Sequence, residues 1–223
     1  MYFDNNSKVT SKSTATYFKV SKPVDNGFKI QKYTIDNQLM YMETYKDREH
    51  KIMNGPAIYY YNNRKIDKEG KYADNKRDET WKYYFDSGQI AAIVLFKNEE
   101  LIEAKYFDQN GQQSKIARKP NEIPSFNGTG FDGIAKYIKT NLKYPEKAFK
   151  NNIQGKVVIA FTINKDGHVT DAKVDKSINE ELDNEALRII NTMPDWTPDY
   201  DFNRPVSVRF VIPITFELKS VSK

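Results

Sequence analysis

The sequence predicts two domains of mixed class, an amino-terminal all-β antiparallel sheet and a carboxy-terminal α+β domain. In the first half, an aromatic residue followed by a polar turn and the start of a new strand-like run recurs. Strand-like and helix-like apolar patterns alternate in the second half, and a polar stretch with two prolines lies between them. The 223 residues allow one or two domains, at roughly 100–200 residues each. We expect domains at residues 1–116 and 126–219, joined by a linker at residues 117–125.

The first half contains an internal repeat. Three copies of an aromatic residue, a polar turn and a restart begin at Tyr61, Phe85 and Phe107, at spacings of 24 and 22 residues. Short aromatic and β-branched runs between the turns are suited to strands, so each repeat is expected to be a β-hairpin. Residues 33–45 look like a degenerate copy. Residues 2 to about 116 are therefore expected to form one elongated, twisted antiparallel sheet.

Over residues ~17–116 this pattern resembles the MORN-type repeats of bacterial envelope proteins. The best copy runs from Glu79 to Gln89, with the sequence ETWKYYFDSGQ. Glu79 stands where glycine is usual, and Asn63 is interpreted as the counterpart of the turn glycine in the first copy. The resemblance implies an all-β sheet of hairpins.

Twelve of the fifteen tyrosines lie in this half. Exposed tyrosine rows can stack on sugar rings or lie at a lipid headgroup layer. Alternatively, the rings fill the core of a thin sheet and pair across strands. Because strand side chains alternate, the runs at residues 59–61 and 83–85 place aromatic rings on both faces, so part of the aromatic surface is expected to be exposed.

The second half begins with a glycine-rich stretch at residues 126–133. It has no preceding strand and no Lys-Ser/Thr, so a phosphate-binding loop is not expected. A helix is predicted at residues 131–142, because four apolar side chains recur at helical spacing on its inner face. These are Ile134, Tyr137, Ile138 and Leu142.

A hairpin, a helix and a last strand follow. Residues 157–163 alternate in the manner of a strand, and Asn164-Lys165-Asp166-Gly167 supplies a tight turn. Ser177-Ile178-Asn179-Glu180 fits a capping box, and the amphipathic helix after it ends before Pro194. Residues 206–216 then alternate again.

These elements predict a three-stranded sheet with the first hairpin strand in the centre and the last strand at one edge. Pro213 has no N–H and is tolerated mainly at edges or bulges, which supports the edge position of residues 206–216. An edge strand offers unpaired backbone groups to a partner.

In this order and over residues ~124–218, the motifs resemble those of the TonB C-terminal domain family. They are Tyr144-Pro145, Gly155, Asp166-Gly167, Leu182-Asp183-x-Glu185-Ala186, Met193-Pro194-x-Trp196-x-Pro198 and Pro213-Ile214-x-Phe216. The chain departs from the family at Asp199, where glycine often follows Trp-x-Pro. It also shows no amino-terminal anchor and no Pro-rich spacer.

The resemblance implies a periplasmic protein, not an enzyme, that receives an extended segment of a protein partner by β-augmentation on its last strand. A TonB box of an outer-membrane transporter is the example that the family suggests. The partner-binding residues would be Val206, Ser207, Val208, Arg209, Phe210, Val211, Ile212, Pro213 and Ile214. Tyr144, Pro145 and Trp196 are expected to form a structural clasp.

The alternative is an envelope scaffold whose repeat sheet binds cell wall, lipid or protein, with the second domain used for dimerisation. Residues 1–119 hold 21 basic against 16 acidic residues, and residues 120–223 hold 14 of each. This excess favours peptidoglycan or a membrane surface as a partner, or it is only a solvated surface. The basic residues are dispersed, so nucleic acid is not an expected partner.

Composition argues against catalysis. There are no cysteines, and the two histidines, His50 and His168, lack metal-ligand spacing, so we expect no metal, no cofactor and no enzymatic activity. The chain starts without a basic n-region and apolar h-region. We therefore expect the trimmed, mature part of an envelope protein, with a cytoplasmic protein as the alternative.

Overall fold

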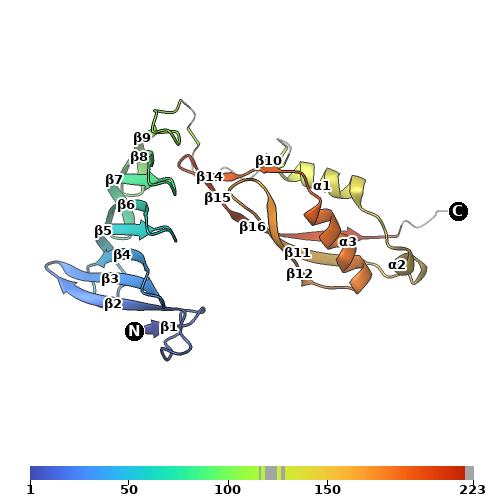
Figure 1. Ribbon diagram of the computed structural model, residues 1–223, viewed down its shortest axis with the longest axis horizontal. Coiled ribbons are helices and arrows are strands. Elements are labelled where there is room, and N and C mark those ends of the chain that lie inside the picture. The colour runs from blue at the N-terminus through green and yellow to red at the C-terminus, as the bar shows by residue number, and fades with distance from the viewer. Residues whose placement is uncertain (116, 119–124, 127–128, 219–223) are drawn as a thin grey trace. The chain divides into compact units, whose positions relative to one another are not determined.

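The computed structural model describes residues 1–115, 117–118, 125–126 and 129–218 (Figure 1). The chain forms two compact units. The first contains Met1–Ala117 together with Phe202–Arg204, and the second contains Arg118–Asp201 and Pro205–Lys223. Most of the predicted linker lies outside the described residues. Among the described residues, no helix is long and apolar enough to span a bilayer.

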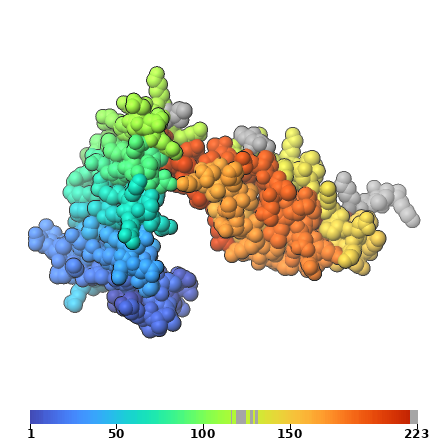
Figure 2. Space-filling view, viewed as in Figure 1, coloured from blue at the N-terminus to red at the C-terminus, as the bar shows by residue number. Residues whose placement is uncertain are grey.

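The first unit is a single antiparallel sheet of nine strands in which each strand pairs with the next along the chain. Figure 2 shows these strands as successive bands of colour from blue to green. The prediction of one antiparallel sheet over this half is confirmed. The strands are β1 (Tyr2–Phe3), β2 (Tyr17–Val24), β3 (Gly27–Thr34), β4 (Leu39–Tyr45), β5 (Met53–Tyr60), β6 (Ile66–Ala73), β7 (Lys76–Tyr84), β8 (Ile90–Lys97) and β9 (Glu100–Tyr106).

One turn geometry recurs along one end of this sheet. Asn37, Arg64, Gly88 and Gly111 occupy the same turn position, with φ of 61°, 69°, 91° and 78°. The N–H of each donates to the carbonyl three residues earlier. The counterpart of the turn glycine in the first predicted copy is therefore Arg64 and not Asn63. The sequence interpretation missed this because asparagine tolerates left-handed backbone better than arginine does.

Side chains of one turn bond to the backbone of the next. Asn63 Nδ2 donates to Asp86 O at 2.8 Å, Lys65 Nζ to Ser87 O at 2.5 Å, and Tyr61 Oη to Tyr84 O at 2.6 Å. These contacts join residues 22 or 23 positions apart, which is close to the repeat spacing in the sequence. The repeat is therefore a unit of structure as well as of sequence. The MORN-like label stays a prediction.

Aromatic side chains fill the core of the first unit. Trp81 is fully buried against Gly70, where an added Cβ would lie 2.3 Å from the indole. Phe202 is also buried, with its ring centroid 4.2 Å from that of Tyr83 and 6.1 Å from that of Phe96. Its φ of 49° is unusual for a bulky residue. Burial of the ring offsets this backbone cost.

The second unit contains a three-stranded antiparallel sheet in the order β12-β11-β16. The central position of β11 (Gly155–Ile163), between β12 (Val169–Lys176) and β16 (Val208–Phe216), confirms the predicted strand order. Side chains of α1 (Gly130–Asn141) and α3 (Glu180–Asn191) pack with β11 and β16 in one core. The core residues include Ile134, Val157, Ile159, Phe161, Leu182, Ala186, Ile190, Ile214 and Phe216.

Several short elements were not predicted. They are α2 (Glu146–Lys150), a two-stranded sheet of β10 (Ser125–Phe126) with β13 (Trp196–Thr197), and a hairpin of β14 (Asp199–Asp201) with β15 (Arg204–Val206). Elements this short carry too few residues to show a periodic pattern.

The predicted hairpin turn is confirmed. Asn164 N donates to His168 O at 2.9 Å, and Gly167 has φ of 92°. A Cβ at Gly167 would lie 2.0 Å from Trp196 O, and Trp196 N donates to Gly167 O at 2.8 Å. Only glycine therefore permits this turn to lie against the segment that follows α3.

Helix α3 begins later than the predicted capping box. Its N-cap is Asn179, whose side chain accepts a hydrogen bond from Leu182 N at 3.0 Å. The hydroxyl of Ser177 instead donates to Asp183, which also accepts from Ile178 N. Asparagine is as good an N-cap as serine, so the two candidates could not be ranked from the sequence.

Arg64 provides a test of the turn geometry. Arg64→Gly should stabilise the first unit by about 1 kcal/mol, because an exposed arginine held at positive φ is relieved of its steric cost. Thermal unfolding followed by the fluorescence of Trp81, in a Trp196→Phe background, measures this unit separately.

Gly88→Ala is the matched control at the equivalent turn and should destabilise the same unit. An unchanged midpoint in both variants would contradict the common turn geometry.

Candidate functional site

The edge strand β16 is the candidate site. It pairs with β11 through nine consecutive residue pairs, from Gly155↔Phe216 to Ile163↔Val208, without a register shift. No strand among the described residues pairs with its other side. A long, regular edge is thus available on this sheet.

The predicted strand of residues 206–216 is interrupted at Ser207. Val206 belongs to β15 and pairs with β14, whereas Val208 begins β16. The alternation of apolar residues runs through both strands, so the break could not be predicted from the sequence pattern. Asp199, at the departure from the family pattern, starts β14, and its carboxylate accepts from Tyr200 N at 2.7 Å.

Side chains of β16 alternate between the core and an exposed face. Ile214 and Phe216 are fully buried, and Phe210 and Ile212 are partly buried against the same core. Arg209, Val211 and Pro213 are exposed, Val211 to 53%. Val211 is therefore a large apolar side chain beside an open edge.

The position of Pro213 indicates which backbone groups face outward. An antiparallel strand directs its backbone groups alternately to its two sides. Pro213 pairs with Val158 inside the regular ladder but has no N–H to give, so its side of the strand faces away from β11. Leu218, of the opposite parity, donates its N–H toward Gln154, next to β11, at 2.8 Å. Residues 209, 211, 213 and 215 therefore direct their backbone groups to the open edge.

The other long edges are less suited to pairing. Strand β12 has two register shifts, positive φ at Asp171, and exposed charges at Lys173 and Asp175. Strand β9 has a register shift against β8, and β2 carries Lys22 and Pro23 toward its end. Bulges, charges and prolines are features by which proteins protect an edge from pairing. Among these strands, β16 has the longest regular edge.

Tyr144 and Pro145 lie at the opposite end of the sheet from Ser207. Tyr144 Oη donates to Ile153 O at 2.6 Å, and its ring meets that of Phe216 edge-on with centroids 5.8 Å apart. Pro145 is the N-cap residue of α2. The two residues tie the start of α2 to the end of β16.

Trp196 lies in the core of the second unit and is 4% exposed. Its ring contacts those of Phe126, Phe161 and Phe210, with centroid distances of 5.2, 6.3 and 5.6 Å. Its Nε1 has no hydrogen-bond partner among the described residues. Through Phe210, Trp196 supports the inner face of β16.

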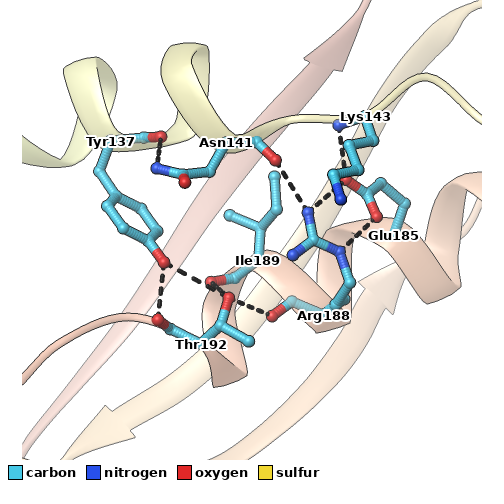
Figure 3. Close-up of polar contacts among 7 residues, drawn as sticks. All are labelled: Tyr137, Asn141, Lys143, Glu185, Arg188, Ile189 and Thr192. Carbon is cyan, nitrogen blue, oxygen red and sulfur yellow. Dashed lines mark hydrogen bonds and ion pairs between the residues drawn. The ribbon is translucent and has the colours of Figure 1, made fainter.

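Polar contacts join the end of α1 to α3 (Figure 3). Arg188 holds the carboxylate of Glu185 through two hydrogen bonds, at 2.7 and 2.8 Å, and donates to Asn141 O at 2.8 Å. Lys143 N donates to Glu185 at 2.6 Å, and Tyr137 Oη donates to Thr192 O at 2.6 Å. These bonds satisfy carbonyls at the ends of both helices.

The Glu185 side chain is 10% exposed. Burial opposes its ionisation, but the hydrogen bonds from Arg188 and Lys143 outweigh burial and hold the pKa of Glu185 below its usual value of 4.5. The glutamate of the family motif therefore acts as a structural anchor between helices.

A second surface lies on the first unit. Side chains of five consecutive strands stand in register as Lys19, Lys32, Tyr41, Tyr59 and Lys68, which we name the Lys–Tyr row. Lys32 Nζ lies 3.9 Å from the ring centroid of Tyr17, and Lys68 Nζ lies 4.9 Å from that of Tyr59. Among the described residues, no carboxylate lies within ion-pair distance of these three lysines.

The histidines are apart from one another. His50 lies close to Ser21, at 3.1 Å, and His168 pairs with Asp195 at 2.7 Å on the surface. Within the described ranges, no group of three or more histidine, cysteine or acidic side chains is placed to hold a metal ion.

Comparison with known proteins finds similarity over the second unit. Residues 140–218 match the family described as Gram-negative bacterial TonB protein C-terminal. The chain is similar to the Protein TonB of Helicobacter pylori strain J99, with 39% identity over 83 residues, which is 37% of this chain and 28% of that protein. The Protein TonB of Haemophilus influenzae is 32% identical over 105 residues, 44% of this chain and 39% of that protein.

A solution structure of the Helicobacter pylori TonB carboxy-terminal domain has 33% identity and a TM-score of 0.33, covering 40% of this chain and 81% of that one. The second unit is a small α+β domain, and its residues 140–218 match the model of the TonB C-terminal family. The chain spans 28% to 39% of the length of these curated relatives.

Glu185 provides a test of the contacts between the helices. A pKa that is lower in the folded state stabilises the protein above the unfolded pKa, and this stabilisation is lost as pH falls through the folded value. The second unit should therefore lose stability as pH falls from about 5, measured by Trp196 fluorescence in a Trp81→Phe background.

Glu185→Gln should lower stability at neutral pH and flatten this dependence. Glu180→Gln, at an exposed position of the same helix, is the control. An equally steep pH dependence in Glu185→Gln would contradict the assignment.

Proposed function

We propose that the protein is a periplasmic or envelope-associated binding protein that receives an extended peptide segment on the open edge of β16. The single observation that carries this proposal is the regular edge of β16, which pairs with no strand in the described part of the chain and lies beside an exposed apolar side chain. Main-chain hydrogen bonds would supply affinity, and alternate side chains would supply specificity. The segment of an outer-membrane transporter that family members bind is the partner we propose.

The proposal assigns no chemical step to the protein. The functional groups of the site are backbone N–H and C=O groups, a guanidinium and apolar side chains, none of which is arranged for acid–base or nucleophilic work. A binding role needs only these groups. We therefore propose that the protein is not an enzyme.

An NMR titration of the full chain with extended, valine-rich peptides tests the proposal. The amides of Ser207, Arg209 and Val211 should shift on binding, because their backbone groups lie at the edge. Val211→Pro should weaken binding about threefold to tenfold, because it removes one central donor.

Thr215→Pro, on the same side of the strand but beyond Pro213, is the control and should bind normally. Trp196 fluorescence verifies that both variants are folded. Binding without shifts in residues 207–212, or unchanged affinity in Val211→Pro, would contradict edge pairing.

The Lys–Tyr row favours a second candidate function, an envelope scaffold that contacts the cell wall. Its lysines lack acidic partners among the described residues, and its tyrosine rings lie between them. Rings of this kind stack on sugars, and ammonium groups bind carboxylates. Cosedimentation with purified peptidoglycan should be weakened by Lys32→Gln with Lys68→Gln. Equal sedimentation of the two proteins would refute this candidate.

A further inference from the structure

Arg209 places a cationic side chain at the open edge. It is exposed, it stands directly opposite Thr162 of β11, and no carboxylate lies within ion-pair distance among the described residues. The uncovered face of the sheet is hollowed next to it, over Ala160, with Lys173 and Asp171 on the far rim. The hollow is therefore lined by two basic side chains and one acidic side chain, and this net positive charge favours the binding of an anionic group.

We propose that Arg209 and Pro213 determine which segment β16 accepts. Arg209 selects an acidic side chain, and Pro213 ends the pairing and disfavours a second copy of this chain. The inference rests on the proposed function of β16 and adds the chemistry of its partner.

The register of a paired segment fixes which side chains meet. A residue directly opposite Arg209 on an added strand would have its Cβ about 4.5–5.5 Å from that of Arg209, on the same face. An acidic side chain there would form an ion pair at the rim of the hollow. The residue opposite Val211, two positions along, would be apolar. The residue between them faces the side of Phe210 and Ile212, and so would also be apolar.

Pro213 limits the length of the pairing. Arg209 and Val211 each offer both an N–H and a C=O to the edge, whereas Pro213 offers only its C=O. A strand that extends beyond residue 212 therefore leaves one of its carbonyls without a donor. The segment that fits best pairs over residues 207–212 and then leaves the sheet.

The same two residues disfavour pairing between copies. An antiparallel pair of β16 strands centred on Val211 would set Arg209 of each copy opposite Pro213 of the other, and two hydrogen bonds would be missing. A pair centred on Arg209 would bring two guanidinium groups together, and like charges directly opposite are destabilising. The edge thus favours a different, acidic segment over its own copy.

The experiment uses the full chain and short peptides of valine and threonine. One series of peptides carries a single glutamate near the amino end and another near the carboxyl end, so that parallel and antiparallel pairing are both tested. In matched analogues, glutamine or lysine replaces the glutamate. The glutamate peptide should bind about twofold to fivefold more tightly than the glutamine peptide, the range of an exposed ion pair. The lysine peptide should bind most weakly.

Arg209→Glu should reverse this order, so that the lysine peptide binds best, and Arg209→Ala should make the peptides equal. Pro213→Val should bind a longer peptide more tightly and should self-associate in sedimentation velocity, whereas the parent chain should not.

Two failures are distinguishable. If the peptides shift the amides of residues 207–212 but Arg209→Glu leaves their order unchanged, this inference is overturned and the proposed function stands. If no peptide of any charge shifts these amides, the proposed function fails and the inference fails with it. Self-association of the parent chain through β16 would also overturn the role of Pro213.

Discussion

A strand at the edge of a sheet has half of its backbone hydrogen-bonding groups without a strand partner, and this constraint governs the second unit. The core holds β16 in place through Phe210, Ile212, Ile214 and Phe216 and thereby fixes which groups face outward. Trp196 packs on Phe210, and Tyr144 packs on Phe216, so aromatic contacts on the core face support both ends of β16.

In the first unit, most strand edges are paired with neighbouring strands. Each hairpin is paired on both sides by its neighbours, and side chains of each turn bond to the next turn. Among the residues that the structure describes in this unit, only the outermost strands have open edges, and register shifts or Lys and Pro residues make these edges irregular. The contrast supports the view that the regular edge of β16 is retained for binding.

Long periodic elements could be predicted from the sequence, and short or non-local ones could not. The alternation in β11, the helical spacing in α3 and the position of Pro213 led to the observed strand order. The break at Ser207 was missed because Val206 and Val208 continue one alternating pattern through two different ladders. The burial of Phe202 in the first unit depends on contacts between residues more than 100 positions apart, which no local pattern encodes.

Native-state amide exchange tests the openness of the β16 edge most directly. In the free protein, the amides of Phe210, Ile212 and Ile214 should be protected, because they bond to β11. Those of Arg209, Val211 and Thr215 should exchange at rates close to those of unfolded chain, although they alternate with the protected ones along the same strand. Strong protection of Arg209 and Val211 would show that the edge is already covered and would contradict the account.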